Sequence, residues 1–201
     1  MSKLRVRGLA AVGVAVCGVA SLVTVNPASA APREAAAAAA EPPIVVTGDP
    51  ASKGAVSRAT CPEGTVLAGG GYASAPVVNG FGQPTFDFVT ANAPSKSTPN
   101  SWSAKMLKGT ITAYALCYTS TTEPPVVVAG PVGAAGKPSY ATCPEGTQLA
   151  GGGYLYSPVA NELGEIQDTE IANGPSKSTP NTWVVRLLKG SSVAFAMCNK
   201  A

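Results

Sequence analysis

The chain has 201 residues, of which 45% are hydrophobic and only 12% are charged, and this balance excludes a protein that is disordered over most of its length. It contains no histidine, so zinc sites are not expected and a serine or cysteine nucleophile has no histidine base to activate it. The formal net charge of +3 gives no strongly basic surface for nucleic acid.

A secretory signal peptide is predicted at residues 1–30. Lysine and arginine at positions 3, 5 and 7 precede an apolar run over residues 8–25. Residues 28–30, Ala-Ser-Ala, have the form of a cleavage site. We therefore expect cleavage after Ala30 and a secreted, extracellular protein.

Two alternatives for this N-terminus stay open. The apolar run lies at the lower limit of length for an uncleaved membrane anchor. Cys17 is a conceivable lipid attachment site, although Val16 before it is bulkier than the small residue expected there. Cleavage removes three of the 14 basic residues and none of the 11 acidic ones, so the remaining chain is neutral. We expect no nucleic-acid partner and no membrane span in the mature chain.

The mature chain contains a long internal repeat, in which residues 42–119 recur as residues 124–201. The matching segments are residues 59–65 with 141–147, 67–72 with 149–154, 94–100 with 175–181, and 107–109 with 188–190. Residues 31–41 are expected to be a flexible, alanine-rich lead-in, and residues 120–123 a short linker. Two copies of so long a unit indicate a duplicated domain, because solenoids use shorter units in three or more copies.

Each copy is predicted to consist of strands, giving an all-β protein of two tandem small β-sandwich or barrel-like domains. Short segments rich in Val, Thr, Tyr and Phe are bounded by Gly and Pro, as is typical of strands. In the first copy the expected strands are residues 44–47, 55–60, 66–74, 86–91, 102–107 and 111–117. Lys108 and Gly109 are expected to form the last turn.

The last strand of each copy is predicted to be central in its sheet. Ala113, Ala115 and Cys117 alternate with Tyr114 and Leu116, so neither face is polar. A strand that is apolar on both faces is buried on both. We expect the face of small residues to lie close against a second layer.

Four cysteines remain after cleavage, namely Cys61, Cys117, Cys143 and Cys198. An even number in an exported chain indicates disulfides, although four cysteines allow three pairings. Duplication favours Cys61–Cys117 and Cys143–Cys198, because a single ancestral copy needed its own bond. Each such bond predicts about 4 kcal/mol of stabilisation on the chain-entropy model.

Two identical polar loops are the candidate binding loops. Their candidate residues are Ser95, Lys96, Ser97, Thr98 and Asn100, and Ser176, Lys177, Ser178, Thr179 and Asn181. A structural interpretation makes each loop a proline-defined connection whose Asn sets the turn before a core Trp, Trp102 or Trp183. A functional interpretation makes it a binding loop on a β scaffold, with tryptophans exposed for stacking on sugars. The alternation around Trp102 favours the structural interpretation.

The other motifs favour structural roles. Gly69-Gly70-Gly71 lacks the Gly-Lys-Ser/Thr of a phosphate loop and indicates a bulge or close strand packing. Four acidic residues, Glu162, Glu165, Asp168 and Glu170, are expected to belong to the second copy alone, and they lack the spacing of a known calcium loop. We interpret them as a solvated loop and expect no metal and no cofactor.

The pattern Cys-Pro-x-Gly-Thr, Gly-Gly-Gly-Tyr, a Trp-led strand and Ala-Tyr-Ala-x-Cys resembles a repeat of exported actinobacterial proteins. The resemblance covers nearly all of the mature chain. That family has no assigned activity, so the resemblance implies export and the disulfide and transfers no site residue.

These observations predict a secreted, non-enzymatic structural or interaction protein that acts outside the cell or at the cell envelope. Its partner is expected to be an unidentified extracellular protein or glycan. One alternative is a carbohydrate-binding module that uses its aromatic residues. Another is a secreted protease inhibitor that uses the Ser-Lys-Ser-Thr loop.

Overall fold

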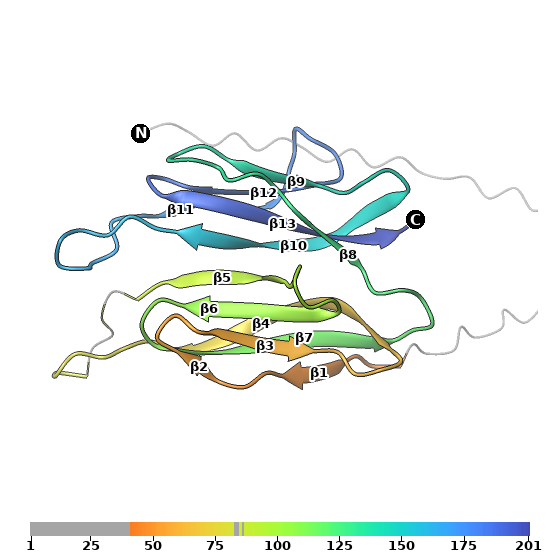
Figure 1. The fold of residues 1–201 in the computed structure, drawn as a ribbon, viewed down its shortest axis with the longest axis horizontal. Coiled ribbons are helices and arrows are strands. Elements are labelled where there is room, and N and C mark those ends of the chain that lie inside the picture. The colour runs from red at the N-terminus through yellow and green to blue at the C-terminus, as the bar shows by residue number, and fades with distance from the viewer. Residues whose placement is uncertain (1–40, 83–84, 86) are drawn as a thin grey trace, which may run out of the picture. The chain divides into compact units, whose positions relative to one another are not determined.

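A computed structural model describes residues 41–82, 85 and 87–201, so the predicted signal peptide and most of the lead-in lie outside the described residues. The described residues form strands and no helix (Figure 1). Residues 42–119, here called repeat 1, contain β1 (Ile44–Thr47), β2 (Ala51–Ser52), β3 (Val56–Thr60), β4 (Thr65–Ala75), β5 (Val89–Pro94), β6 (Ser101–Met106) and β7 (Thr110–Thr119). Residues 124–201, repeat 2, contain β8 (Val126–Ala129), β9 (Ser139–Thr142), β10 (Thr147–Ser157), β11 (Glu170–Pro175), β12 (Thr182–Leu187) and β13 (Ser191–Lys200).

The protein is all-β, with two tandem small β-sandwich domains that each contain one disulfide. In repeat 1, β7 pairs with β4 and with both β1 and β2, while β6 pairs with β3 and β5 to form the opposite layer. In repeat 2, β13 pairs with β10 and β8, and β12 pairs with β9 and β11. Every pairing is antiparallel. The predicted fold class is therefore confirmed.

Most strands lie where the sequence predicts them. The strand expected at residues 86–91 is instead β5, at Val89–Pro94, and Phe86 lies outside the described residues. The short strand β2 was not anticipated, because two residues carry no recognisable alternation. Lys108 and Gly109 form the turn between β6 and β7, as expected.

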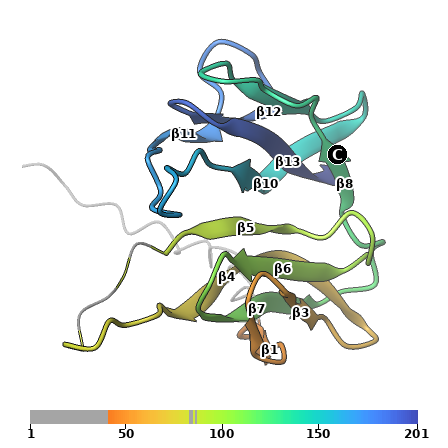
Figure 2. The same cartoon turned by 60° about the vertical axis from the view of Figure 1, so that its left-hand side comes forward.

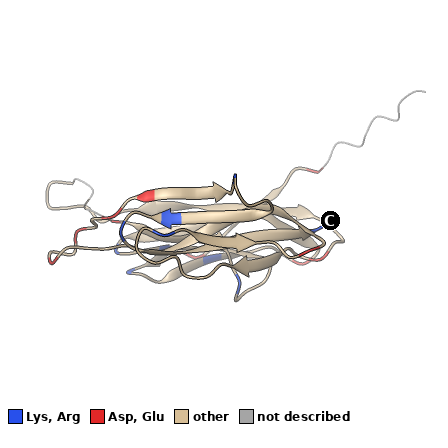
Figure 3. Ribbon diagram, turned by 90° about the horizontal axis from the view of Figure 1, so that it is seen from above, with Lys and Arg blue, Asp and Glu red and all other residues tan. Residues whose placement is uncertain are grey.

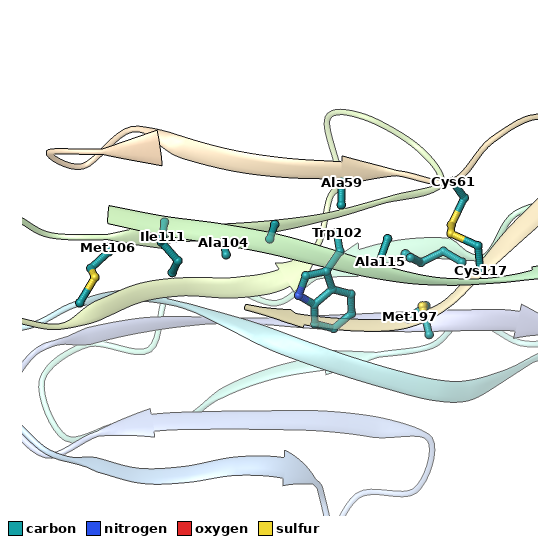
Figure 4. Packing of buried hydrophobic residues seen from close by; sticks show 11 residues of the cluster. Ala59, Cys61, Trp102, Ala104, Met106, Ile111, Ala115, Cys117 and Met197 are labelled. Atoms are coloured by element: carbon teal, nitrogen blue, oxygen red, sulfur yellow. A yellow bond between two sulfur atoms is a disulfide. The ribbon is translucent and has the colours of Figure 1, made fainter. Parts of the chain in front are cut away.

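The last strand of each repeat is central, as its apolar faces predict. β7 lies between β4 on one side and β1 with β2 on the other, and β13 lies between β10 and β8. Ala113, Ala115 and Cys117 are fully buried against the second layer. Small side chains there allow the two layers to approach closely, and Figure 4 shows Ala115 and Cys117 within the core of repeat 1.

The triple glycine creates a bulge and a close contact with tryptophan. The register between β4 and β7 shifts between Leu67 and Gly69, which marks a β-bulge. A Cβ atom at Gly70 would overlap the indole ring of Trp102, which packs across the sandwich from β6. Gly152 has the same relation to Trp183 in repeat 2. Both roles predicted for this motif, bulge and close packing, are present.

The two repeats share one sheet. β5 of repeat 1 pairs with β10 of repeat 2, so that β3, β6, β5, β10, β13 and β8 form a six-stranded sheet. The paired residues are Asn92 with Tyr154 and Ala91 with Leu155. Figures 1 and 2 show β5 lying beside β10 at this junction. The tandem domains are thus joined by backbone pairing as well as by the linker.

Among the described residues there is no helix of the length and apolarity needed to cross a bilayer.

Candidate functional site

The two disulfides pair as predicted, Cys61 with Cys117 and Cys143 with Cys198. Their Cα atoms are 5.7 and 5.6 Å apart, and each bond joins the start of the turn after β3 or β9 to the last strand of the same repeat. The four sulfurs are consumed in cross-links between layers. The cysteines therefore serve the scaffold that carries any binding surface.

One asparagine in each candidate loop anchors that loop to the disulfide. Asn100 adopts a left-handed backbone conformation, with φ 57°. Its Oδ1 accepts a hydrogen bond from the Leu67 backbone N–H at 2.7 Å, and its Nδ2 donates to the Thr65 carbonyl at 2.8 Å. The Asn100 carbonyl accepts the Cys61 N–H at 2.9 Å.

Asn181 repeats the anchor in the second loop. Its φ is 56°, its Oδ1 accepts the Leu149 N–H at 2.6 Å, and its Nδ2 donates to the Thr147 carbonyl at 2.8 Å. The side-chain amides of both asparagines are thus used within the fold. They hold the loop to the strand that carries the triple glycine.

The remaining candidate loop residues divide into structural and exposed ones. The Ser95 hydroxyl accepts the Thr98 N–H at 3.1 Å, and the Ser176 hydroxyl accepts the Thr179 N–H at 3.0 Å. The side chains open to solvent are Lys96 and Ser97 in the first loop and Lys177, Ser178 and Thr179 in the second. Thr98 is half-buried.

The two tryptophans differ in how far they are buried. Trp102 is only 4% exposed, and its indole Nε1 donates to Asn92 Oδ1 at 2.7 Å. Trp183 is half-buried over Gly152 and donates to Asn173 Oδ1 at 3.0 Å. Because a stacking platform must be accessible to a sugar ring, burial removes Trp102 from the carbohydrate-binding alternative.

Three of the four acidic residues singled out in repeat 2 have separate hydrogen-bond partners: Glu165 bonds to Asn161, Glu170 bonds to Tyr156, and Asp168 bonds to backbone groups of a turn. Asp168 accepts the backbone N–H groups of Gly190 at 2.6 Å and Lys189 at 2.9 Å, at the turn between β12 and β13. The expectation that these acids belong to repeat 2 alone is wrong for Asp168, because Asp87 accepts the Lys108 and Gly109 N–H groups in the same way. Among the described residues, no cluster of three or more His, Cys, Asp or Glu side chains could hold a metal ion.

Hydrogen bonding changes the acidity of Asp168. Partial desolvation acts to raise the pKa of this carboxyl group, but bonds from four backbone N–H groups, those of Lys189, Val159, Thr169 and Gly190, favour the ionised form. The pKa of Asp168 is therefore lowered from its ordinary value. Ionised Asp168 is a fixed part of the turn rather than a free acid.

Tyrosines fill the core of repeat 2 next to the junction. Tyr154 and Tyr156 stack with ring centroids 4.1 Å apart, and the Tyr156 hydroxyl donates to Glu170 Oε2 at 2.8 Å. Burial, together with Tyr72 and Glu170, raises the pKa of Tyr154 well above its ordinary range. Burial and the bond to Glu170 likewise raise the pKa of Tyr156. Both phenols are neutral at physiological pH.

The first candidate loop borders a groove of about 340 Å³ at the junction of the repeats, here called the junction groove. Apolar side chains from both repeats form much of its lining: Val56, Ala91, Ala93, Pro94, Leu155 and Phe195. Ser95, Lys96 and Ser97 of the first candidate loop also line it, whereas no residue of the second loop does. The two candidate loops therefore do not form one site.

Basic side chains give the junction groove its charge. Arg58, Lys96 and Lys105 line it, and none of the described residues that line it is acidic. Arg58 Nε is 3.4 Å from the Ser103 hydroxyl, which leaves the rest of the guanidinium available to a ligand. Charged residues are sparse over the rest of the fold, where most of the ribbon is uncharged (Figure 3). An apolar surface bordered by cations fits an anionic, partly apolar segment.

One part of the junction groove was predictable from the sequence, and the rest was not. The loop residues 95–97 are among the predicted candidates, but Arg58, Lys105, Leu155 and Phe195 are not. Alternation does place Lys105 on the polar face of its strand, whereas Phe195 belongs to a strand predicted to be buried on both faces and is instead half-buried. The pairing of β5 with β10, which brings these faces together, leaves no signal in either repeat alone.

A comparison of the chain with protein-family models, with curated proteins and with solved structures finds no match.

Proposed function

We propose that this protein is a non-enzymatic interaction protein that acts outside the cell or at the cell envelope, and that the junction groove is its binding surface. The observation that carries the proposal is the groove itself, with an apolar lining from both repeats and three basic side chains. Two intradomain disulfides support an extracellular location, because such bonds persist in oxidising compartments.

The groove favours an extended protein segment that alternates acidic and apolar side chains. Arg58 and Lys105 lie on the outward faces of the paired strands β3 and β6, and Lys96 lies on the loop that follows β5. Acidic side chains of a ligand would meet these cations, while its apolar side chains would cover Leu155 and Phe195. Such a contact buries apolar area and uses charge to fix register and orientation.

A labelled peptide of alternating leucine and glutamate tests this proposal by fluorescence anisotropy. We expect binding that weakens with added salt, and a loss of affinity of about tenfold or more in Arg58→Glu and Lys96→Glu variants. Lys177→Glu is the matched control, because Lys177 is the equivalent exposed lysine of the second loop and does not line the groove. Equal binding of a leucine–lysine peptide, or equal loss in all three variants, would contradict the proposal.

The same assay separates the two alternatives. An acidic polysaccharide that binds in place of the peptide, with the same dependence on Arg58, would support carbohydrate binding in the groove rather than through Trp102. Protease inhibition requires slowing of at least one secreted protease by the intact chain and loss of that effect on substitution of the exposed Lys96 and Ser97.

A further inference from the structure

Both repeats place their longest connecting segments at the same end of the fold. β4 finishes at Ala75, opposite Thr110 at the start of β7, and β10 finishes at Ser157, opposite Ser191 at the start of β13. Because β10 pairs antiparallel with β5, which itself begins beside the end of β6, these ends of the two repeats lie together. Figure 1 shows the segments after β4 and β10 extending beyond the neighbouring turns. We call this region the loop end; it comprises residues 76–82 and 158–169 and the turns at residues 52–55, 107–109, 131–138 and 188–190.

The most exposed large apolar side chains of the described residues are gathered at the loop end. They are Phe81 at 91%, Leu163 at 82% and Val132 at 67%. Phe81 follows β4, Leu163 follows β10, and Val132 precedes Gly133, which bridges to the start of β13. Single exposed apolar residues are normal on a protein surface, but their concentration in one place marks an interaction surface. Other exposed apolar residues of the loop end are Val77, Val78, Val159 and Leu188.

Equivalent turns hold the two most exposed side chains at their tips. The Oδ1 of Asn79 accepts the Phe81 N–H at 3.0 Å, and the Oδ1 of Asn161 accepts the Leu163 N–H at 3.1 Å. The next residue in each turn is a glycine with φ of 74° or 73°. Asn-Gly-Phe-Gly and Asn-Glu-Leu-Gly thus form the same turn in the two repeats, each with a large apolar residue at the third position.

Lysines occupy the shorter turns of the same end. One exposed lysine lies in each of the four turns, at Lys53, Lys108, Lys137 and Lys189. The Lys108 Nζ donates to the Gly164 carbonyl at 3.0 Å, which links a turn of repeat 1 to the projecting segment of repeat 2. Carboxylates also lie at this end, with Asp87 and Asp168 held in the turns and Glu162 exposed beside Leu163. Apolar contact rather than net charge must therefore supply most of any binding here.

The shape of the loop end favours a fluid partner. Phe81 and Leu163 are single side chains at the tips of separate turns, and a rigid protein partner would need a shaped pocket for each one. A lipid interface closes around a projecting side chain without such a pocket and favours aromatic and aliphatic groups at its boundary. The lysines of the shorter turns lie behind the tips, where their ammonium groups suit the phosphates of lipid headgroups.

The described chain also begins and finishes away from the loop end. Ile44 at the start of β1 pairs with Cys117, and Lys200 at the end of β13 pairs with Thr147. Both pairs lie at the disulfide end of their repeats. The loop end can therefore approach a flat surface without obstruction from either end of the described chain.

We propose that the loop end binds the surface of a phospholipid bilayer, with Phe81 and Leu163 inserted at the boundary between headgroups and acyl chains. Burial of the two apolar side chains drives the contact, and the lysines orient the molecule on the headgroups. The binding surface is separate from the junction groove, which neither Phe81 nor Leu163 lines.

Tryptophan substitutions at the tips test the proposal in the full chain. Phe81→Trp and Leu163→Trp each place a fluorophore where insertion is proposed, and vesicles of equal parts phosphatidylcholine and phosphatidylglycerol are the probe. We expect emission to shift to shorter wavelength and to be quenched by bromine atoms on the acyl chains. Val45→Trp is the matched control, because Val45 on β1 is 61% exposed near the disulfide end and should show neither change. The apolar run at residues 8–25 is present in every variant, so differences between variants report the loop end.

A second substitution shows whether the two tips act together. Adding Leu163→Ser to Phe81→Trp should raise the lipid concentration for half-maximal shift by about tenfold or more, because one of the two inserted side chains is lost. Adding Val45→Ser instead should leave that concentration unchanged. Both Leu163 and Val45 are exposed, so neither substitution removes a core contact.

Three outcomes would overturn the proposal. One is a tryptophan at position 81 or 163 that keeps its aqueous emission when vesicles are present. Another is an unchanged lipid dependence on addition of Leu163→Ser. The third is a spectral shift that appears without lipid as the protein concentration rises, which would assign the tips to contacts between copies of the chain. Because the tips lie outside the junction groove, none of these results depends on the peptide-binding test.

Discussion

β4 and β10 have the same glycine motif and the same bulge, and each pairs with the last strand of its own repeat, yet their environments differ. In β10, Gly153 lies against the backbone of β5 and Tyr154 is 7% exposed; in β4, Gly71 faces open space and Tyr72 is 39% exposed. The middle glycine behaves alike in both strands, because Gly70 and Gly152 each lie under a tryptophan. The motif thus has one role inside its own sandwich and a second role that needs a neighbour.

The largest effect is expected from removing the disulfides, which tests whether the two repeats depend equally on their cross-links. Removing one disulfide, as Cys61→Ala with Cys117→Ala or Cys143→Ala with Cys198→Ala, should destabilise the protein by about 4 kcal/mol in either repeat, because the loops are of nearly equal length. Denaturant unfolding with matched probes in each repeat measures both. A clearly larger loss in one repeat would show that the halves differ by more than their edges.

A smaller effect on stability is expected from substitutions at the third glycine of the motif, Gly153 in β10 or Gly71 in β4. Gly153→Ala should destabilise the protein by about 1–3 kcal/mol, because the methyl group forces β5 away from β10. Gly71→Ala should change stability by no more than about 0.5 kcal/mol. Both are read from urea unfolding. Similar losses for the two variants would remove the distinction between the edges.

Asp87 and Asp168 accept hydrogen bonds at equivalent turns, so removing either side chain should lower the stability of the protein by a similar amount. Asp168→Ala and Asp87→Ala each leave backbone N–H groups without their acceptor, at an expected cost of about 1–3 kcal/mol. For Asp168 the folded pKa is lowered, so its contribution is present above the unfolded value of about 3.9 and is lost as the pH falls below it. Acid unfolding of wild type against Asp168→Asn measures this term, and an unchanged acid midpoint would contradict it.

The smallest expected effect lies at the tyrosines beside the junction. The folded pKa of Tyr156 is raised, so its contribution is complete below the unfolded value of about 10 and is lost as the pH rises above it. Tyr156→Phe removes the bond to Glu170, at a cost of about 1 kcal/mol near neutral pH. It should also flatten the alkaline loss of stability. Thermal unfolding between neutral and alkaline pH checks both, and an alkaline slope equal to that of wild type would oppose the assignment.

Much of the fold was accessible from the sequence because its signals are local. The alternation in residues 111–117 predicts a central strand, and the repeated cysteines predict one bond per repeat; both are confirmed. The strand predicted at residues 86–91 lies at Val89–Pro94 and contains a bulge between Val89 and Ala91, which local alternation does not locate.

The candidate site was less accessible because it forms between repeats. The identical loops at residues 94–100 and 175–181 gave no reason to expect that only the first would line a groove. Their fixed parts, Asn100 and Asn181, act through bonds to β4 and β10 rather than through exposure. The difference arises from one edge pairing, β5 with β10, which the sequence of either repeat alone does not specify.

The placement of the cross-links also determines how this molecule responds to tension. Each disulfide closes a loop within its own repeat, and the bonded cysteines are 56 and 55 residues apart in the sequence. Force applied to the two ends of the chain therefore cannot extend the segments inside these loops while the disulfides are intact. Only the stretches outside the two closed loops can lengthen, at about 3.4 Å per residue. Reduction of the two disulfides would allow the segments inside the closed loops to extend as well.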